Sequence, residues 1–464
     1  MRTENLLRAR TAVVALGALS VVAFAACGSD GEPAATAVPP TQVPATAVPT
    51  TPPTTSFDVT IENVGTVFDF TGTGVGGDAP AGPGDSFTFE FDAAPGSALS
   101  FATMFVPSND FFFAPGEDGI ALFDSEGSPI SGDVTSAVSL WDAGTEADQE
   151  PGAGSEQPLM NGGNADDTAD TNTSVREAAD TFGNLPAVGD VVKVSLDHLS
   201  GSRFMATIEN VSTPDTISTA DGANSAVPLT PPVWVVHSAP APLFSIGEAD
   251  RGEGLETLAE TGSPATLSAS LTTRTGLTSP LAPGAFVVHT SDDPIFTDGA
   301  PDRGEGLEAL AEDGSPDALS TALAGVSGVV SAGAFAVPSG SSDPGPLFPG
   351  SSYSFTFTAE PGDNLSFATM LVQTNDLFYG PNGKGIALFD GSGNPVSGDI
   401  TSQLLLWDAG TETNQSPGTG SDQAPRQAGA NTGDAESGNV QIVQDEFSYP
   451  GVSDIVRVTI TPGN

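Results

Sequence analysis

Internal repetition constrains this chain more than any other feature. The segments Leu99–Met104 and Leu365–Met370 both read Leu-Ser-Phe-Ala-Thr-Met, and Leu140–Glu146 and Leu406–Glu412 both read Leu-Trp-Asp-Ala-Gly-Thr-Glu. The same offset of 266 residues relates both pairs, so no gap is needed to align them. A repeat of this length is typical of a duplicated domain. At 464 residues, the chain is long enough for each copy to bury its own core. The sequence therefore predicts two related domains.

Local patterns predict strands in both copies. Ser86–Phe91 and Ser352–Phe357 alternate apolar with polar residues, which is the period of a half-buried strand. Val191–Leu196 and Ile455–Ile460 show the same pattern, and clusters of Gly and Pro supply turns between such segments. Many short strands with turns between them favour an all-β fold. We expect two antiparallel β-sandwich domains.

A second repeat bears on the domain boundary. Thr60–Val64 matches Thr207–Val211 at an offset of 147, not 266. The motif Asp-Arg-Gly-Glu-Gly-Leu-Glu occurs at Asp250–Glu256 and again 52 residues later, and the residues after its second Gly favour one or two helical turns. We expect a first domain over 56–200 and a second over 201–464, which carries an inserted pair of 52-residue repeats at about 233–336.

The N-terminus has the features of an export signal. Arg residues precede an apolar stretch, Thr11–Phe24, that is too short for a comfortable membrane span. Cys27, the single cysteine, follows small residues, an arrangement that resembles the bacterial lipobox; the alternative is an ordinary signal peptide with an incidental cysteine. We expect a lipoprotein signal peptide over 1–26 and a disordered Thr/Pro-rich tether over 27–55. The expected location is secreted and lipid-anchored, at the bacterial cell surface or in the periplasm.

The charge balance restricts the partners. Asp and Glu total 59 against 12 Lys and Arg, for a formal net charge of −47. Such a field repels nucleic acid and anionic lipid headgroups, and it attracts divalent cations. We therefore expect no nucleic-acid partner, and membrane attachment only through a lipidated Cys27.

Acidic residues recur at equivalent places in the two copies. Each copy has an Asn-Asp step before an apolar run and two acids within Trp-Asp-Ala-Gly-Thr-Glu. Calcium needs six to eight oxygen ligands, commonly carboxylates and carbonyls on flexible loops. The alternative is that these acids only shape turns, as Asp beside Gly often does. The candidate residues are Asp110, Asp142 and Glu146 in the first copy, and Asp376, Asp408 and Glu412 in the second.

The same motifs resemble the spondin N-terminal domain family. The resemblance is specific over roughly 85–160 and 350–425 and rests on Ser-Phe-Ala-Thr-Met, Pro-Ser-Asn-Asp-Phe-Phe, Gly-Ile-Ala-Leu-Phe and Leu-Trp-Asp-Ala-Gly-Thr-Glu. It implies a β-sandwich similar to calcium-dependent phospholipid-binding modules. It also implies one calcium ion in each copy, held by the three acids named above for that copy. Glu146 and Glu412 stand where animal members have Asp, and Phe111 and Leu377 where they have Trp.

Other features admit competing interpretations. Phe111–Phe113 and Leu377–Tyr379 adjoin the candidate ligands; we expect them in the core, and the alternative is a loop tip that touches a partner. A hydrolase using His289 with Ser291 and Asp292 is conceivable, but no nucleophile elbow or His-Glu-x-x-His pattern is present. We therefore expect no catalytic residues.

Taken together, the sequence predicts a non-catalytic, surface-anchored calcium-binding protein of adhesion or recognition. Its partner would be an extracellular protein or a polysaccharide. One alternative is a structural envelope protein whose metal only stabilises the fold. A second is a hydrolase that acts on an extracellular polymer.

Overall fold

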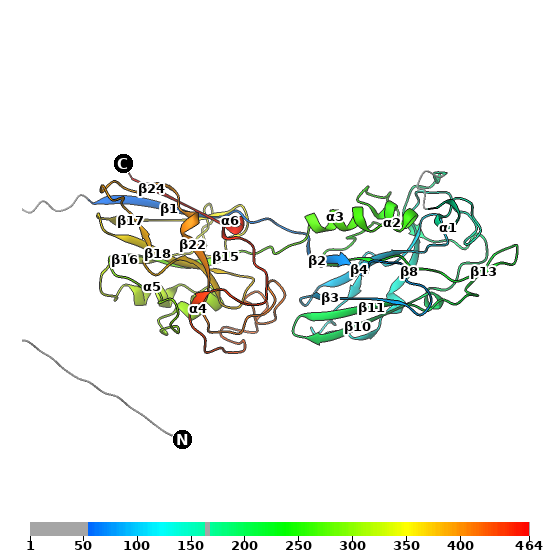
Figure 1. Cartoon of the computed structure of the whole chain (residues 1–464). Coiled ribbons are helices and arrows are strands. Elements are labelled where there is room, and N and C mark those ends of the chain that lie inside the picture. Colours follow the sequence, from blue (N-terminus) through cyan, green and yellow to red (C-terminus); the bar gives the residue numbers. More distant parts are fainter. Residues whose placement is uncertain (1–53, 163–167, 464) are drawn as a thin grey trace, which may run out of the picture. The chain divides into compact units, whose positions relative to one another are not determined.

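Antiparallel strands dominate the computed structural model, which describes residues 54–162 and 168–463 (Figure 1). The expected signal peptide, Cys27 and nearly all of the expected tether lie outside these ranges. No helix within the described ranges is long and apolar enough to cross a membrane. The all-β class expected from the alternating patterns is confirmed.

Two facing sheets, built from strands between residues 70 and 237, enclose one hydrophobic core, and we call them sheet pair 1. Alternating side chains such as Phe87, Phe89 and Phe91 point into this core, where they join Phe101 and Phe113 of the facing sheet. The shorter sheet has the order β3 (Ser86–Asp92), β11 (Arg203–Asn210), β10 (Val192–Ser200) and β7 (Gly132–Asp133). The longer sheet runs β2 (Phe70–Val75), β14 (Val233–His237), β4 (Ala98–Met104), β5 (Phe111–Pro115), β8 (Val138–Asp142) and β9 (Arg176–Glu177), with β6 (Ile120–Ala121) beside β4.

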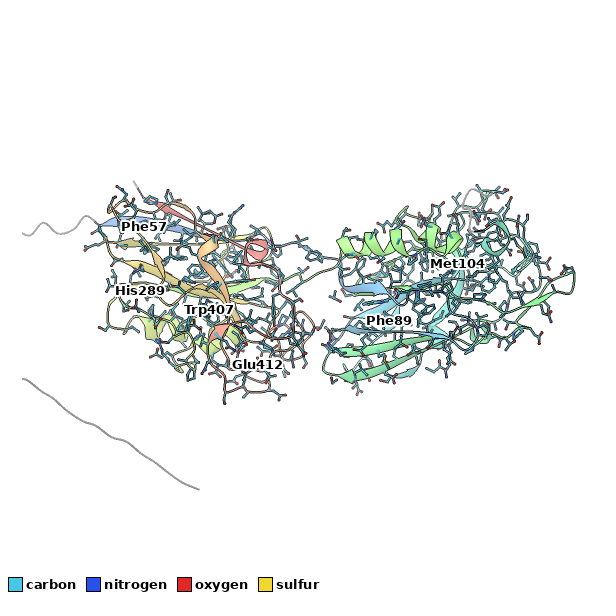
Figure 2. The ribbon with its side chains drawn as sticks, viewed as in Figure 1. Phe57, Phe89, Met104, His289, Trp407 and Glu412 are labelled. Carbon is cyan, nitrogen blue, oxygen red and sulfur yellow. The ribbon has the colours of Figure 1, made fainter. Side chains whose placement is uncertain are left out.

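Sheet pair 2 repeats this arrangement strand for strand. Phe57 from β1 lies in its core beside Phe357 and Phe389 (Figure 2). The shorter sheet has the order β17 (Ser352–Ala359), β1 (Thr55–Asn63), β24 (Val456–Pro462) and β21 (Gly398–Asp399). The longer sheet runs β16 (Val329–Phe335), β15 (Leu281–His289), β18 (Asn364–Leu371), β19 (Leu377–Pro381), β22 (Leu404–Asp408) and β23 (Gln441–Ile442), with β20 (Ile386–Ala387) beside β18. Short elements complete the chain: β12 (Ile217–Ser218), β13 (Asn224–Ser225), α1 (Pro158–Asn161) and α6 (Val452–Ile455).

A pair of short helices covers the outer face of each longer sheet. The helical turns expected after Asp-Arg-Gly-Glu-Gly form as α2 (Leu255–Thr261) and α4 (Leu307–Asp313), and each is followed by a second helix, α3 (Ala265–Thr273) or α5 (Asp317–Leu323). Their leucines meet the outward side chains of the sheet in a second hydrophobic cluster. The longer sheets are therefore buried on both faces, which explains why β5 and β19 read as continuous apolar runs.

Strand pairing divides the chain differently from the boundary expected at residue 200. β1 lies between β17 and β24 and so completes sheet pair 2, as Figure 1 shows for the blue strand. β11 occupies the equivalent place in sheet pair 1, between β3 and β10. The 52-residue repeats are not one insertion, because β14, α2 and α3 belong to sheet pair 1 while β15, α4 and α5 belong to sheet pair 2.

The boundary at residue 200 was wrong because β1 and β11 share the pattern that this place in a shorter sheet requires, so either strand could have completed either sheet pair. Each alternates buried residues with partly buried or exposed ones and ends in a buried Asn. Asn63 donates to two backbone carbonyls of sheet pair 2, and Asn210 donates to two of sheet pair 1. Phe57, Val59 and Ile61 are fully buried in β1, and burying them contributes roughly 5–8 kcal/mol to the free energy of unfolding.

Candidate metal centre

Strand pairing brings the first two candidate ligands together. Asp110 immediately precedes β5, and Asp142 is the last residue of β8. The two strands are antiparallel neighbours with Phe111 opposite Asp142, so both carboxylates lie at the same edge of the longer sheet. Both residues are almost fully buried: Asp110 is 0% exposed and Asp142 is 1% exposed.

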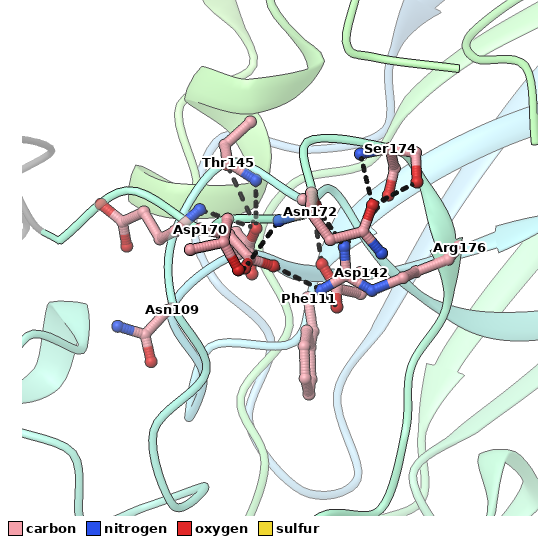
Figure 3. Close-up of polar contacts among 12 residues, drawn as sticks. Asn109, Phe111, Asp142, Thr145, Asp170, Asn172, Ser174 and Arg176 are labelled. Atoms are coloured by element: carbon pink, nitrogen blue, oxygen red, sulfur yellow. Dashed lines mark hydrogen bonds and ion pairs between the residues drawn. The ribbon is translucent and has the colours of Figure 1, made fainter. Parts of the chain in front are cut away.

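The loop that follows β8 bonds to Asp110 through Thr145 and Glu146; Thr145 is labelled in Figure 3. Oδ2 of Asp110 accepts hydrogen bonds from the backbone N–H of Thr145 at 2.8 Å, from the hydroxyl of Thr145 at 3.2 Å and from the backbone N–H of Glu146 at 3.1 Å. Its other oxygen, Oδ1, is buried and has no hydrogen-bond partner in the described part of the chain. One carboxylate oxygen therefore fixes the loop, and the other is buried without satisfying any donor among the described residues.

Asp142 shapes the start of the same loop. Its Oδ1 accepts a hydrogen bond from the N–H of Gly144 at 2.7 Å. Gly144 has φ +71°, and a Cβ there would lie 2.7 Å from the carbonyl oxygen of Ser174, so the tight turn requires glycine. Asp142 Oδ2 forms an ion pair with Arg176, which also pairs with Asp170 at 2.6 Å (Figure 3).

A third carboxylate, which the sequence analysis did not single out, joins this edge. Asp110, Asp142 and Asp148 each offer an oxygen, and these oxygens lie within 4.8 Å of one another. Oδ1 of Asp148 is buried without a hydrogen-bond partner among the described residues. Glu146 stands on the same loop and contributes its backbone N–H to Asp110. Asp148 was overlooked because its counterpart in the second copy is the neutral Asn414.

The second copy repeats the hydrogen bonds of the first. Oδ2 of Asp376 accepts from Thr411 N–H at 2.8 Å, from Thr411 Oγ1 at 3.2 Å and from Glu412 N–H at 3.2 Å. Asp408 Oδ1 accepts from Gly410 N–H at 2.7 Å. Asp376 Oδ1 and Glu412 Oε1 are buried without hydrogen-bond partners in the described ranges.

A helix adds a carboxylate to the second copy that sequence reasoning missed. Glu312 on α4 is 3% exposed, and its charge acts on Glu412, which is also 3% exposed (Figure 2 labels Glu412). Glu312 hydrogen-bonds to Thr411. Glu260 of α2, its counterpart in the first repeat, is 5% exposed. Glu is rarely buried on a helix. The repetition of Glu260 as Glu312 in the two 52-residue repeats was therefore the sequence signal that could have pointed to Glu312.

The burial of these acids changes their protonation. Burial, reinforced by the neighbouring charges of Asp110 and Asp148, raises the pKa of Asp142 to about 7. Burial and the charge of Asp408 raise the pKa of Asp376 to about 7, and burial and the charge of Glu312 do the same for Glu412. Burial also raises the pKa of Asp148, to about 6. Carboxyl groups placed in this way favour a bound proton or a bound cation over an uncompensated charge.

Aromatic residues hold both loops in place. Trp141 and Trp407 lie between the longer sheet and its helices, and their indole N–H groups donate to the carbonyl oxygens of Ala114 and Gly380. The expectation that Phe111–Phe113 belong to the core is confirmed: all are at most 3% exposed. Phe111 and Phe113 face the other sheet, and Phe112 faces the helices.

The histidines form a repeated buried pair with serines. Nε2 of His237 lies 2.9 Å from the hydroxyl of Ser100, and Nε2 of His289 lies 2.9 Å from that of Ser366. The Nδ1 atom of His289 bonds to the backbone carbonyl of Ser291, not to its hydroxyl. Both histidines are at most 2% exposed, and burial lowers the pKa of each. These pairs tie adjacent strands together, and the hydrolase constellation of His289, Ser291 and Asp292 is not assembled.

The donor set fits a hard divalent cation. Calcium is bound by oxygen ligands from carboxylates, carbonyls and waters. The first copy offers three converging carboxylate oxygens, and Asp110 and Asp148 each carry a buried oxygen without a hydrogen-bond partner among the described residues. In the second copy, Asp376 and Glu412 carry such oxygens, but among the described residues a converging group of three acids is found only in the first copy. No protein-family model matches the chain, and a search of curated proteins returns no match. The assignment of a function therefore depends on the geometry of these two edges.

Proposed function

We propose that the chain is a calcium-binding recognition or adhesion protein of the cell surface. In this proposal, each sheet pair is a β-sandwich domain similar to the spondin N-terminal domain, and Cys27 carries the lipid anchor. Asp110, Asp142 and Asp148 would hold one ion, with Glu146 on the adjoining loop. Asp376, Asp408 and Glu412 would hold another. The ion would neutralise the buried charge and fix the loop after β8 or β22, which would then present a defined surface to an extracellular protein or polysaccharide.

One observation carries this proposal. At both edges, a fully buried Asp uses one oxygen to accept three hydrogen bonds from the loop while its other oxygen has no hydrogen-bond partner in the described part of the chain. An unpartnered buried carboxylate oxygen costs several kcal/mol unless a proton or a cation reaches it. A turn-shaping Asp, by contrast, is normally exposed to solvent, as Asp124 and Asp390 are.

Thermal unfolding in calcium and in chelator tests the proposal. We expect calcium to raise the midpoint of the full chain, because an ion that binds only the folded state stabilises it by mass action. The double variant Asp110→Asn with Asp376→Asn should lose this increase. The matched control is Asp124→Asn with Asp390→Asn, since both residues are exposed turn acids at equivalent positions, and it should keep the increase. An unchanged midpoint for the natural chain in calcium would refute the proposal.

A structural envelope protein is the second candidate, and the burial of the acids favours it. Asp110 and Asp376 are both 0% exposed, so an ion held there would be largely enclosed by the chain. Such an ion would stabilise the loops without taking a ligand from a partner. Binding to cells or to extracellular polysaccharide, measured with and without calcium, separates the two: calcium-dependent binding supports recognition, and calcium-dependent stability without any binding supports the structural role.

A further inference from the structure

The two candidate sites differ at the residue that pairs, on the neighbouring strand, with Asp142 in the first site and Asp408 in the second. In the first, β9 places Arg176 opposite Asp142. In the second, β23 places Gln441 opposite Asp408. The two positions are equivalent by strand register, because Trp141 pairs with Glu177 as Trp407 pairs with Ile442. The duplicated site therefore carries a fixed positive charge in one copy and a neutral amide in the other.

Arg176 is held firmly at the first site. One terminal nitrogen donates to the carbonyl oxygens of Asn172 and Ser174, at 2.6 and 3.2 Å. The other pairs with Asp142 and Asp170 (Figure 3). The side chain is 27% exposed, so part of it remains accessible to solvent. It lies against the same carboxylate that a divalent cation would use.

A second difference compensates for the first. Asp148, whose oxygen converges with those of Asp110 and Asp142, has Asn414 as its counterpart. In the second copy, Nδ2 of Asn414 donates to Oδ2 of Asp408 at 3.0 Å. That is the oxygen equivalent to the one on Asp142 that Arg176 contacts in the first copy. The first copy thus adds one carboxylate and one guanidinium, and the second replaces both with amides, which leaves the sum of these charges unchanged.

We propose that Arg176 is an internal counter-ion that opposes cation binding at the first site, and that Asp148 compensates for it, so that two opposing charges set the affinity of this site. This inference rests on the proposed calcium-binding function. A cation entering the first site must compete with a guanidinium for Asp142, whereas Asp408 has no ion pair with a positive side chain among the described residues. Asp148 offsets this competition by supplying a third carboxylate. Arg176 is in this sense a positioning residue that sets affinity and is not itself a ligand.

Coulomb interactions give the direction of each effect. Removing the positive charge while keeping Asp148 leaves an excess of negative charge, so Arg176→Gln should tighten calcium binding at the first site, by about tenfold for a partly screened charge a few ångströms away. Asp148→Asn keeps the guanidinium and removes a ligand, so it should weaken binding by about tenfold or more. The double variant carries the residues of the second copy and should return close to the starting affinity.

Calcium titration calorimetry on the full chain tests the inference. The background variant Asp376→Asn weakens the second site and leaves the first to be observed. In that background, we expect Arg176→Gln to tighten calcium binding and Asp148→Asn to weaken it. The double variant should bind calcium with about the starting affinity. Arg274→Gln is the matched control. Arg274 is an ion-paired arginine of sheet pair 1, is 33% exposed, and bonds to Asp69 and Glu253 away from the site. It should leave calcium affinity unchanged.

Variants that place residues of the first copy in the second copy keep the inference testable if Arg176→Gln fails to fold. Gln441→Arg, placed in an Asp110→Asn background, puts a guanidinium opposite Asp408 and should weaken calcium binding at the second site by about tenfold, and adding Asn414→Asp should restore the binding. Failure of the natural chain to bind calcium at all would overturn the proposed function. Calcium binding that is unchanged or weakened by Arg176→Gln, or a double variant whose affinity stays far from that of the starting protein, would overturn the counter-ion role and leave the proposed function standing.

Discussion

The buried carboxylate of Asp376 allows a sharp prediction about the calcium-free protein. Burial and the neighbouring Asp408 raise its pKa from 3.8 to about 7, and its Oδ1 atom has no hydrogen-bond partner within the described ranges. Asp376→Asn preserves the shape of the side chain and an oxygen to accept the three loop hydrogen bonds, while it removes the charge. We therefore expect this substitution at a calcium-binding residue to stabilise the protein when calcium is absent.

The magnitude follows from the two pKa values. Each pH unit between them corresponds to ~1.4 kcal/mol, so ionising Asp376 in the folded state costs about 4 kcal/mol at most. Because the folded state binds this proton more tightly than the unfolded state, the cost is absent below pH 3.8 and complete above pH 7. Relaxation of the loop reduces the effect, and we expect Asp376→Asn to raise the free energy of unfolding by ~2–4 kcal/mol at pH 8 and by almost nothing at pH 4.

Urea unfolding in chelator, at pH 4 and pH 8, measures this directly. The control is Asp399→Asn, an exposed acid whose pKa is lowered by its hydrogen bonds to Thr401. That substitution should be neutral or slightly destabilising at pH 8. In calcium at pH 8, the natural chain should instead be more stable than Asp376→Asn, because it gains the binding energy that the variant has lost. A variant that is less stable than the natural chain in chelator at pH 8 would refute the reasoning.

Two further predictions concern the helix carboxylate and the first strand. Glu312→Gln should weaken calcium binding at the second site only, with Glu256→Gln, an exposed helix acid of the first repeat, as the control; equal effects of the two substitutions in calorimetry would contradict a role for Glu312. Val59→Asp places a charge at a fully buried position of β1, so it should disrupt sheet pair 2 while sheet pair 1 persists. Limited proteolysis followed by mass spectrometry should then show cleavage within 279–463 and protection of 70–275; the opposite pattern would show that β1 belongs to the first pair.

Much of the fold could be predicted from local sequence patterns. The alternation in Ser86–Phe91 and Ser352–Phe357 predicted β3 and β17, and the run Phe111–Phe113 was correctly assigned to the core. The place of β1 could not be predicted in this way. Its motif matches that of β11, and both strands fit the same slot between equivalent neighbours, so only the three-dimensional pairing decides which sheet each one completes.

The candidate site was predictable only where the two copies agree. Asp110 and Asp142 are repeated as Asp376 and Asp408, so repetition drew attention to them. Asp148 and Arg176 have Asn414 and Gln441 as counterparts, and a search for repeated acids passes over them. Glu312 comes from a helix distant in the sequence, and its approach to Glu412 depends on how α4 lies on the longer sheet. Charge compensation of this kind is a property of packing, which no local motif encodes.

A crystal structure of the full chain grown in millimolar calcium would test the central claim most directly. Anomalous scattering should show one calcium peak among the carboxylates of Asp110, Asp142 and Asp148, and another beside Asp376 and Asp408. Oδ1 of Asp110 and Oδ1 of Asp376 should each lie within coordination distance of a peak. Well-ordered density for both loops without a peak at either edge would contradict the claim that these carboxylates bind calcium.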